Sequence, residues 1–171
     1  MFEFLKKKKT QIVSPVCGKC ISITEVPDAV FSEKILGDGF AIIPSGDVIV
    51  SPADGEITTL ADTKHAVGIK TKDDINILLH VGLDTVKLKG VGFQCFVKQG
   101  EKVKAGTPLI HVDHTEIEKR NMNLTTVVVF TEGYDGIVNL NCCGKEVKAG
   151  EVLISWEGGF PWELLKRLTI M

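Results

Sequence analysis

Short apolar segments that alternate with turn residues are the feature of this sequence that most restricts its fold. Typical examples are residues 40–43, 48–50 and 126–130, each followed by a turn rich in proline, glycine, serine or aspartate. Segments of this length and with these boundaries are typical of β-strands. Only residues 115–121 predict a helix of useful length, and residues 30–36 predict one further turn. The sequence therefore predicts an all-β fold with one or two short helices.

Two stretches of the chain repeat one another. Residues 100–110 match residues 144–154, with Val-Lys-Ala-Gly at the centre of both. A shorter echo links residues 14–18 with residues 51–55, where both copies place Ser-Pro ahead of a glycine. Each unit is typical of a strand beside a glycine turn, and the copies are too few and too unevenly spaced for a solenoid. The predicted architecture is an antiparallel β-sandwich or barrel with duplicated strand-turn units.

The composition indicates one domain in a reducing compartment. The chain has 171 residues, 44% of them hydrophobic, which is enough for a sizeable core. A net charge of -2 argues against a nucleic-acid partner. Five cysteines, an odd number, without an export signal predict a cytoplasmic protein. Cys17, Cys20, Cys142 and Cys143 could together bind zinc, but their spacing is loose, and we interpret them as small residues near turns.

The two ends of the chain differ in character from the middle. The basic run from Lys6 to Lys9 predicts a flexible tail over residues 1–10, because it is too short and too charged for a signal peptide or a membrane helix. Peripheral contact of this tail with an anionic membrane surface is the alternative. The domain itself is predicted over residues 11–156. Residues 157–171 form a C-terminal tail of unknown role, either an amphipathic helix or a disordered end.

One predicted hairpin brings two histidines together. Two apolar strands flank a four-residue turn, which places Lys70 opposite Ile75. Counting back along both strands places His65 opposite His80 on one face of the sheet, with Cβ atoms about 4.5–5.5 Å apart. Two imidazoles in contact can take up and release protons, phosphate or a metal near neutral pH. An ordinary polar pair is the alternative reading of two opposed histidines.

The segment around the second histidine matches a known signature. Residues 78–86, Leu-Leu-His-Val-Gly-Leu-Asp-Thr-Val, closely resemble the active-site signature of the glucose-type IIA component (EIIA) of the bacterial phosphoenolpyruvate-dependent sugar phosphotransferase system. Four further landmarks follow the order of that family, at residues 30–39, 51–55, 63–66 and 88–90. The resemblance covers residues 11 to 155, and five landmarks in order make it specific. Departures are local: Asp74 stands where the family often has glycine, and Ala61 and Leu78 stand where it often has phenylalanine.

The resemblance implies a cytoplasmic phosphotransferase that needs no cofactor. In this family a histidine phosphocarrier protein donates a phosphoryl group to the IIA histidine, which passes the group to a cysteine on the IIB domain of a sugar permease. Residues 11–156 are then an EIIA type 1 domain, which is compatible with a free-standing protein and with one domain of a fused permease. The specific sugar depends on the permease, so glucose follows from the family name alone.

The resemblance also assigns roles to the residues around the pair. His80 is the phosphorylated nucleophile, because a neutral imidazole nitrogen offers a lone pair and its phosphoramidate transfers readily. His65 is the partner that stabilises the phosphoryl oxygens. Thr63 lies two residues earlier on the same face and is predicted to fix the tautomer of His65. The backbone carbonyl of Gly82 is predicted to accept a hydrogen bond from the other ring nitrogen of His80.

A docking surface is predicted around the histidines. The carboxylates of Asp28 and Asp84 lie at its rim and complement the basic residues of the carrier protein, although Asp28 can instead simply start the following turn. The family's apolar patch matches Val30, Phe31, Ile35, Leu36, Leu78 and Val86. Such a patch offers partners a desolvated area and keeps water from the phosphohistidine. Core packing is the alternative for Ile35 and Val86 in particular.

Three other functions fit parts of the sequence. A regulatory module would bind permeases and metabolic enzymes according to its phosphorylation state. Zinc hydrolysis would use His65 and His80, which can take adventitious zinc, but it needs a third ligand, and Asp84 is the nearest candidate. A biotin or lipoyl carrier needs a lysine at a hairpin tip between small or methionine residues, which the sequence lacks. His111 and His114 match nothing in the family and are predicted at the surface.

Overall fold

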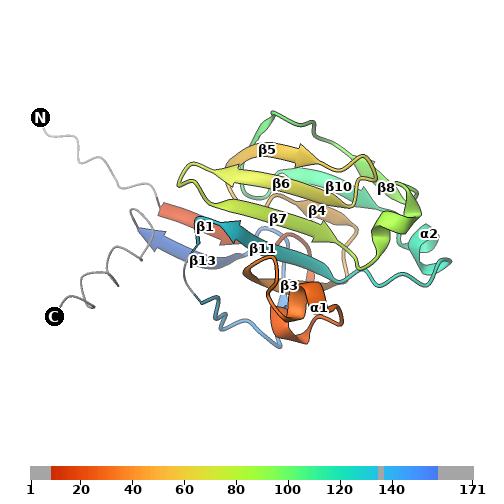
Figure 1. Cartoon of the computed structure of the whole chain (residues 1–171), viewed down its shortest axis with the longest axis horizontal. Coiled ribbons are helices and arrows are strands. Elements are labelled where there is room, and N and C mark those ends of the chain that lie inside the picture. The colour runs from red at the N-terminus through yellow and green to blue at the C-terminus, as the bar shows by residue number, and fades with distance from the viewer. Residues whose placement is uncertain (1–8, 135–136, 158–171) are drawn as a thin grey trace, which may run out of the picture.

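Antiparallel β-sheet dominates the computed structural model (Figure 1), which describes residues 9–134 and 137–157. The predicted tails at residues 1–10 and 157–171 lie largely outside these ranges. Strand β1 already begins at Lys9 and β13 ends at Glu157, and the two strands pair with each other. Residues 9, 10 and 157, which the sequence analysis assigned to the tails, therefore lie in strands.

Three sheets make up the described part of the chain. The largest follows the order β12-β2-β3-β11-β7-β6-β5-β9. Its strands are β2 (Gly18–Ser22), β3 (Asp38–Pro44), β5 (Gly55–Leu60), β6 (Ala66–Thr71), β7 (Asn76–Val81), β9 (Lys102–Val103), β11 (Thr126–Glu132) and β12 (Glu146–Val147). A second sheet has the order β4-β10-β8, with strands β4 (Val48–Val50), β8 (Phe93–Cys95) and β10 (Pro108–Val112), and the third joins β1 (Lys9–Val13) to β13 (Val152–Glu157). The prediction of an all-β antiparallel fold is confirmed.

The helices are short. The turn predicted within residues 30–36 forms as α1 (Ala29–Ser32), and α2 (His114–Glu118) is shorter than the helix predicted at residues 115–121. Helix α1 stops early because the chain turns into the left-handed region at Lys34, with φ of 56°. Two 3-10 turns, η1 (Ile23–Glu25) and η2 (Thr85–Leu88), complete the set within residues 9–134 and 137–157. No helix of that part is long and apolar enough to cross a membrane.

Strand alternation decides which side chains reach the surface near the histidines. Along β7, Ile77, Leu79 and Val81 are buried, and the residues between them are only half-buried. The buried set packs with residues such as Ile49 and Ile110 from the smaller sheet in the main core. The outer face of β3 and β11 is covered separately, by a second cluster that η1 and α1 complete. His80 therefore lies on the outer face of β7, where Phe31 of α1 contacts it.

The two duplicated units predicted from the sequence form matching structures. In both, a buried serine, Ser14 or Ser51, donates its hydroxyl hydrogen to the carbonyl oxygen two residues further on, at 2.8 and 2.7 Å. The N–H of Gly150 donates to the Ser14 carbonyl at 2.9 Å, and that of Gly106 donates to the Ser51 carbonyl at 2.8 Å. Each long repeat forms a two-residue strand, β9 or β12, and then a longer strand, β10 or β13.

The hairpin of β6 and β7 corrects the predicted register. Lys70 pairs with Asn76, and Ala66 rather than His65 pairs with His80. His65 lies one residue before β6. The predicted pairing was therefore wrong by one residue.

The cause of the shift is the length of the turn. Asp74 adopts a left-handed conformation with φ of 58°, and the N–H of Thr71 donates to the carbonyl of Ile75 at 2.9 Å. The turn thus holds three residues instead of four. A three-residue hairpin loop that ends in a left-handed residue is a common form. The left-handed conformation at Asp74 also explains why the family often has glycine at this position.

Candidate functional site

His80 is half-buried near the end of β7, and the backbone holds one of its ring nitrogens. Its Nδ1 lies 2.7 Å from the carbonyl oxygen of Gly82. A carbonyl can only accept a hydrogen bond, so Nδ1 carries the hydrogen and donates. In the neutral ring Nε2 therefore holds the lone pair. This is the arrangement that a nitrogen nucleophile needs.

The turn after β7 holds the Gly82 carbonyl in place. Gly82 has φ of 79°, and a Cβ added there would collide with the methyl group of Thr85 and lie 2.9 Å from the Asn123 carbonyl oxygen. The buried Thr85 hydroxyl donates to the Val81 carbonyl at 2.6 Å. The N–H of Leu83 donates to the Asn123 carbonyl at 2.7 Å. Glycine is therefore needed here both for its backbone conformation and for space.

His65 reaches His80 from the loop that precedes β6. The centroids of the two rings are 4.9 Å apart, with 79° between their planes. Thr63 Oγ1 lies 2.7 Å from His65 Nδ1. The carbonyl of His65 accepts a hydrogen bond from the N–H of Val81 at 2.7 Å, which ties its backbone to the end of β7. The two rings thus meet on one surface, although they do not occupy opposed positions in the ladder.

Phe31 supports the histidine pair from one side. Its ring centroid lies 5.2 Å from that of His80, at an interplanar angle of 61°. Only 4% of Phe31 is exposed. The sequence placed Phe31 among docking residues, but the structure packs it in the cluster under α1, where it restricts the His80 ring and offers a partner little area.

Burial keeps both imidazoles neutral. Desolvation lowers the pKa of His80 below 6.5, and the hydrogen bond to the Gly82 carbonyl, Asp28 and Asp84 oppose that shift. Desolvation also lowers the pKa of His65, and the neighbouring His80 adds to the effect. Both rings are therefore mostly uncharged at pH 7, which leaves the lone pair of His80 available.

Four of the apolar residues predicted for the docking surface are exposed. Ile35 is 65% exposed and Val86 is 49% exposed, so the core-packing alternative for these two residues is wrong. Val30 and Leu36 are also exposed. Leu78 is half-buried and packs against the cluster under α1.

A groove lies on the outer face of β5, β6 and β7, and its lining includes Ala66, the strand partner of His80. Its volume is about 500 Å³, and Ala61, Ala66, Gly68 and Leu78 contribute to its lining. Ala61 and Leu78 are the two positions where the family often carries phenylalanine. The smaller side chains of this chain thus line a hollow beside the site.

The two predicted carboxylates differ in their surroundings. Asp28 caps α1, because its Oδ1 accepts the N–H of Val30 at 2.9 Å, as the turn-initiation alternative predicted. It also raises the pKa of His80, so it acts on the site. Asp84 has φ of 57° and pairs with Lys87 at 3.7 Å.

Residues outside this site fit the structural interpretations. His111 contacts Asp47 at 3.4 Å, and His114 contacts the Gly46 carbonyl at 2.9 Å. Cys20 and Cys142 lie in contact, with Sγ atoms 3.2 Å apart, whereas Cys17 accepts a hydrogen bond from a backbone N–H.

No metal site emerges from residues 9–134 and 137–157. They hold no group of three or more His, Cys, Asp and Glu side chains placed to bind a metal ion. The third ligand that zinc hydrolysis would need is thus not found near His65 and His80 in this part of the chain.

Two supporting residues were not predicted from the sequence. Thr85 stands inside the signature, five residues after His80, and a hydroxyl just after a glycine turn was the available signal. Asn123 is remote in sequence and acts through its backbone carbonyl, so no side-chain pattern could identify it.

Comparisons with known proteins identify the family of this chain. The family model of the phosphoenolpyruvate-dependent sugar phosphotransferase system, EIIA 1, matches residues 10–136. A glucose-specific EIIA component from Bacillus cereus is 48% identical over 126 residues, which are 74% of this chain and 76% of that protein. A glucosamine-specific EIICBA component from Bacillus subtilis is 47% identical over 119 residues, 70% of this chain but 19% of that longer protein.

A solved structure matches as well. The glucose permease IIA from Mycoplasma capricolum superimposes with a TM-score of 0.77 at 39% identity, over 91% of this chain and 99% of that one. The sequence and the fold both indicate the same family. The chain belongs to the EIIA type 1 family of the phosphoenolpyruvate-dependent sugar phosphotransferase system, and it is a phosphotransferase of sugar transport.

Proposed function

We propose that this protein is a cytoplasmic relay that accepts a phosphoryl group on His80 Nε2 and passes it to a sugar permease. The donor is the phosphohistidine of the histidine phosphocarrier protein, and the acceptor is a cysteine of a IIB domain. One observation carries the proposal: the Gly82 carbonyl takes the Nδ1 hydrogen of His80 and leaves Nε2 as the nucleophile. The lowered pKa of His80 keeps that nitrogen unprotonated.

The transfer requires two bond exchanges. In the first, the Nε2–P bond forms as the P–N bond to the carrier histidine breaks, and the carrier nitrogen keeps the electron pair. In the second, a cysteine thiolate of the IIB domain forms a P–S bond as the Nε2–P bond breaks. Both steps pass through a loose transition state in which positioning and charge stabilisation provide most of the catalysis.

His65 supplies the stabilising donor in this scheme. If the Thr63 hydroxyl donates to His65 Nδ1, at the observed 2.7 Å, the hydrogen of the neutral ring sits on Nε2. That N–H can donate to a phosphoryl oxygen held between the two rings, whose centroids are 4.9 Å apart. Thr63 is then a positioning residue for His65.

The surroundings suit protein partners. Exposed Val30, Ile35, Leu36 and Val86 offer apolar area beside the nucleophile. The carboxylates of Asp28 and Asp84 add negative charge at the rim, which favours a basic partner such as the carrier protein. Partner docking would also exclude water from the phosphohistidine.

The test is reconstitution with purified components. The protein is incubated with phosphoenolpyruvate, the general phosphotransferase enzyme and the carrier protein, and acid-labile phosphate is located by mass spectrometry. We expect one phosphate on His80, none in His80→Gln, and transfer slowed roughly 100-fold in His65→Gln. His111→Gln, a histidine substitution outside the site, serves as the control. Acid-labile phosphate that persists on the His80→Gln protein would reject the assignment.

Glucose is the sugar that we propose. The Bacillus cereus relative and the Mycoplasma structure carry glucose in their names, whereas the fused Bacillus subtilis relative is named for glucosamine. The measurement is the transfer of phosphate from the phosphorylated protein to permeases of each sugar class. Faster transfer to a glucosamine permease than to a glucose permease would contradict this choice.

Phosphorylation-dependent regulation is a second candidate for the same face. A dianionic phosphoryl group at His80 would sit among exposed apolar side chains and change which proteins can dock there. A permease or metabolic enzyme that binds the unphosphorylated protein should dissociate after phosphorylation. Equal binding of both forms in a pulldown would exclude this role for that partner.

A further inference from the structure

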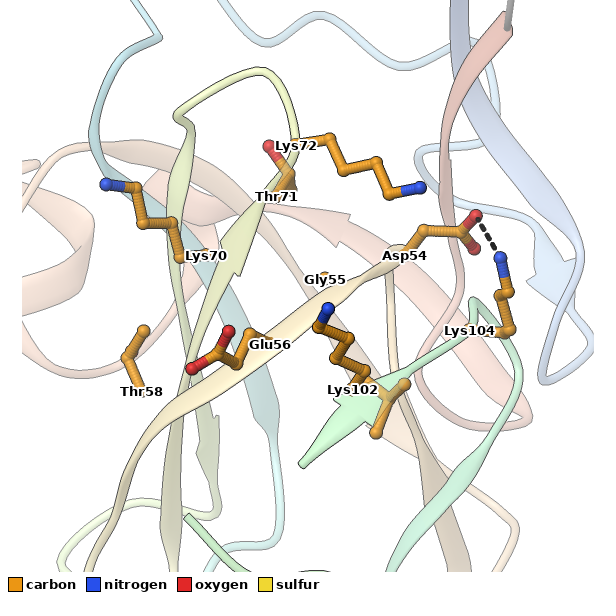
Figure 2. Close-up of a pocket in the computed structure, with 10 residues that line it drawn as sticks. Asp54, Gly55, Glu56, Thr58, Lys70, Thr71, Lys72, Lys102 and Lys104 are labelled. Atoms are coloured by element: carbon orange, nitrogen blue, oxygen red, sulfur yellow. Dashed lines mark ion pairs between the residues drawn. The ribbon is translucent and has the colours of Figure 1, made fainter. Parts of the chain in front are cut away.

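A cleft on the outer face of β5, β6 and β9 gathers four lysines (Figure 2). Its volume is about 440 Å³, which is within the range of small-molecule pockets. We refer to it as the lysine cleft. Its lining comprises Asp54, Gly55, Glu56, Thr58, Lys70, Thr71, Lys72, Lys102, Val103 and Lys104.

Strand register arranges these charges in two rows. Glu56 on the middle strand pairs with Lys70 on β6 and with Lys102 on β9, which gives a row of lysine, glutamate and lysine. Asp54 precedes Glu56 by two residues and therefore shares its face. It lies 3.6 Å from Lys104, and Figure 2 shows Lys72 directed toward it from the other side.

The middle of the cleft has room for an anion. Gly55 lies between the two acidic residues and contributes no side chain. Figure 2 shows the side chain of Lys102 directed toward this central area, whereas Lys72 extends above it toward Asp54. The lining residues include two more lysines than carboxylates, and one of these lysines, Lys70, is paired with Asp74, so the cleft keeps a local excess of one positive charge, which favours an anion.

The ion pairs already present do not oppose binding strongly. Lys70 contacts Asp74 at 3.2 Å, but their side chains are 49% and 85% exposed. Lys104 and Asp54 are also solvated. Exposed pairs of this kind stabilise little, so their lysines can turn toward a bound anion at small cost.

Protection of a sheet edge is the simpler explanation of lysines on a short strand such as β9. The duplicated half of the molecule tests this explanation, because β12 is the equivalent edge strand. There Glu146 stands in the place of Lys102, and Lys19 stands in the place of Glu56. On its other side Lys19 pairs with Ile43, where the cleft has Lys70. Lys104 has a counterpart in Lys148, but the row of lysine, glutamate and lysine belongs to one copy and is not a by-product of the shared scaffold.

We propose that the lysine cleft binds a small organic phosphate. A phosphomonoester dianion would sit over Gly55 between the ammonium groups of Lys72 and Lys102, since lysine is a good point-charge donor to phosphate. The organic part would lie beside Thr58 and Val103. Lys70 lies four residues along β6 from Ala66, about 13 Å, so this ligand would not touch His80.

The experiment is a titration of the whole protein followed by NMR. The probe is glucose 6-phosphate at constant ionic strength, with glucose, inorganic phosphate and chloride as comparisons. We expect saturable shifts at the amides of residues 54–58, 70–72 and 102–104. The double variant Lys72→Gln and Lys102→Gln should bind roughly tenfold to a hundredfold more weakly, because two charge-assisted contacts are lost.

The matched control removes the same charge from the sister unit. Lys145 and Lys148 lie exposed around β12, and their change to glutamine should leave binding unchanged. Equal weakening by both double variants, or the same shifts with chloride, would reduce the effect to ionic screening and overturn the proposal. Inorganic phosphate that binds as tightly as the sugar phosphate, or glucose that binds equally well, would contradict an organic phosphate as the ligand.

The histidine pair is the other place where phosphate could bind. Shifts confined to His65 and His80, and lost in His80→Gln, would overturn the proposal. Shifts in the lysine cleft that persist in His80→Gln would support it. This outcome does not depend on phosphoryl transfer. The experiment can therefore reject ligand binding in the lysine cleft without rejecting the phosphoryl relay, and the reverse.

Discussion

Replacement of Gly82 by alanine tests the physical basis of the site most directly. The carbonyl of Gly82 accepts the Nδ1 hydrogen of His80 at 2.7 Å. The residue has φ of 79°, and an added Cβ would collide with the Thr85 methyl group and lie 2.9 Å from the Asn123 carbonyl oxygen. Thr85 is fully buried and bonded to Val81, so it cannot move away without loss of that hydrogen bond.

The expected loss of unfolding free energy in Gly82→Ala has two separate contributions. A left-handed backbone conformation costs a non-glycine residue about 1–2 kcal/mol. Overpacking against buried neighbours adds about 1–3 kcal/mol. Gly150 separates the two costs, because its φ is 82° and a Cβ added there would meet nothing within 4 Å. Gly150→Ala should therefore lose about 1–2 kcal/mol of unfolding free energy and Gly82→Ala about 2–5 kcal/mol.

The assay combines urea unfolding with phosphorylation kinetics. For a protein of this size, each kcal/mol lowers the melting temperature by about 2–4 °C. Gly82→Ala should also slow phosphorylation roughly tenfold, because the carbonyl that orders the His80 ring is displaced. Gly150→Ala should retain the normal rate. Equal destabilisation by the two substitutions, or an unchanged rate in Gly82→Ala, would refute the reasoning.

Three further predictions concern the titration and the orientation of the histidines. Folding lowers the pKa of His65 and His80, so the unfolded chain binds more protons than the folded chain once the pH falls below about 6.5. The stability of the protein should therefore decrease from pH 7 toward pH 5. The urea midpoint of His80→Gln should depend less on pH in that window than the midpoint of the unsubstituted protein. Asp28→Asn should keep the helix cap but lower the pKa of His80 further, which NMR titration of the ring measures; an unchanged pKa would remove Asp28 from the site. Thr63→Val should slow transfer several-fold and Thr63→Ser should restore it, since only the hydroxyl contacts His65; a defect that serine does not rescue would indicate a packing role.

The repeated units were predictable because their information is local. Glycines at equivalent places, such as Gly106 and Gly150, end equivalent turns with φ of 89° and 82°. Buried serines ahead of proline make the same hydrogen bond in both copies. These contacts span few residues or recur in both halves, so the sequence shows them directly.

Features that depend on tertiary packing were not predictable in the same way. Phe31 matched an apolar docking position in the sequence, but the packing of α1 on β3 and β11 determines that it is buried against His80. Asn123 contributes a backbone carbonyl from another part of the chain. A pattern of side chains holds no information about such a contact.

The histidine pair shows how a loop can compensate for strand register. In a regular ladder, the observed register would place His65 on the buried face of β6, because the strand pairs Ala66 with His80 and successive side chains alternate. His65 does not follow this alternation, because it lies one residue before β6 begins. Lys64 takes a left-handed conformation with φ of 60°, and the N–H of Lys64 donates to the Ala61 carbonyl at 2.8 Å. The loop therefore turns the imidazole onto the outer face, so the same contact that strand counting predicted arises from turn geometry instead.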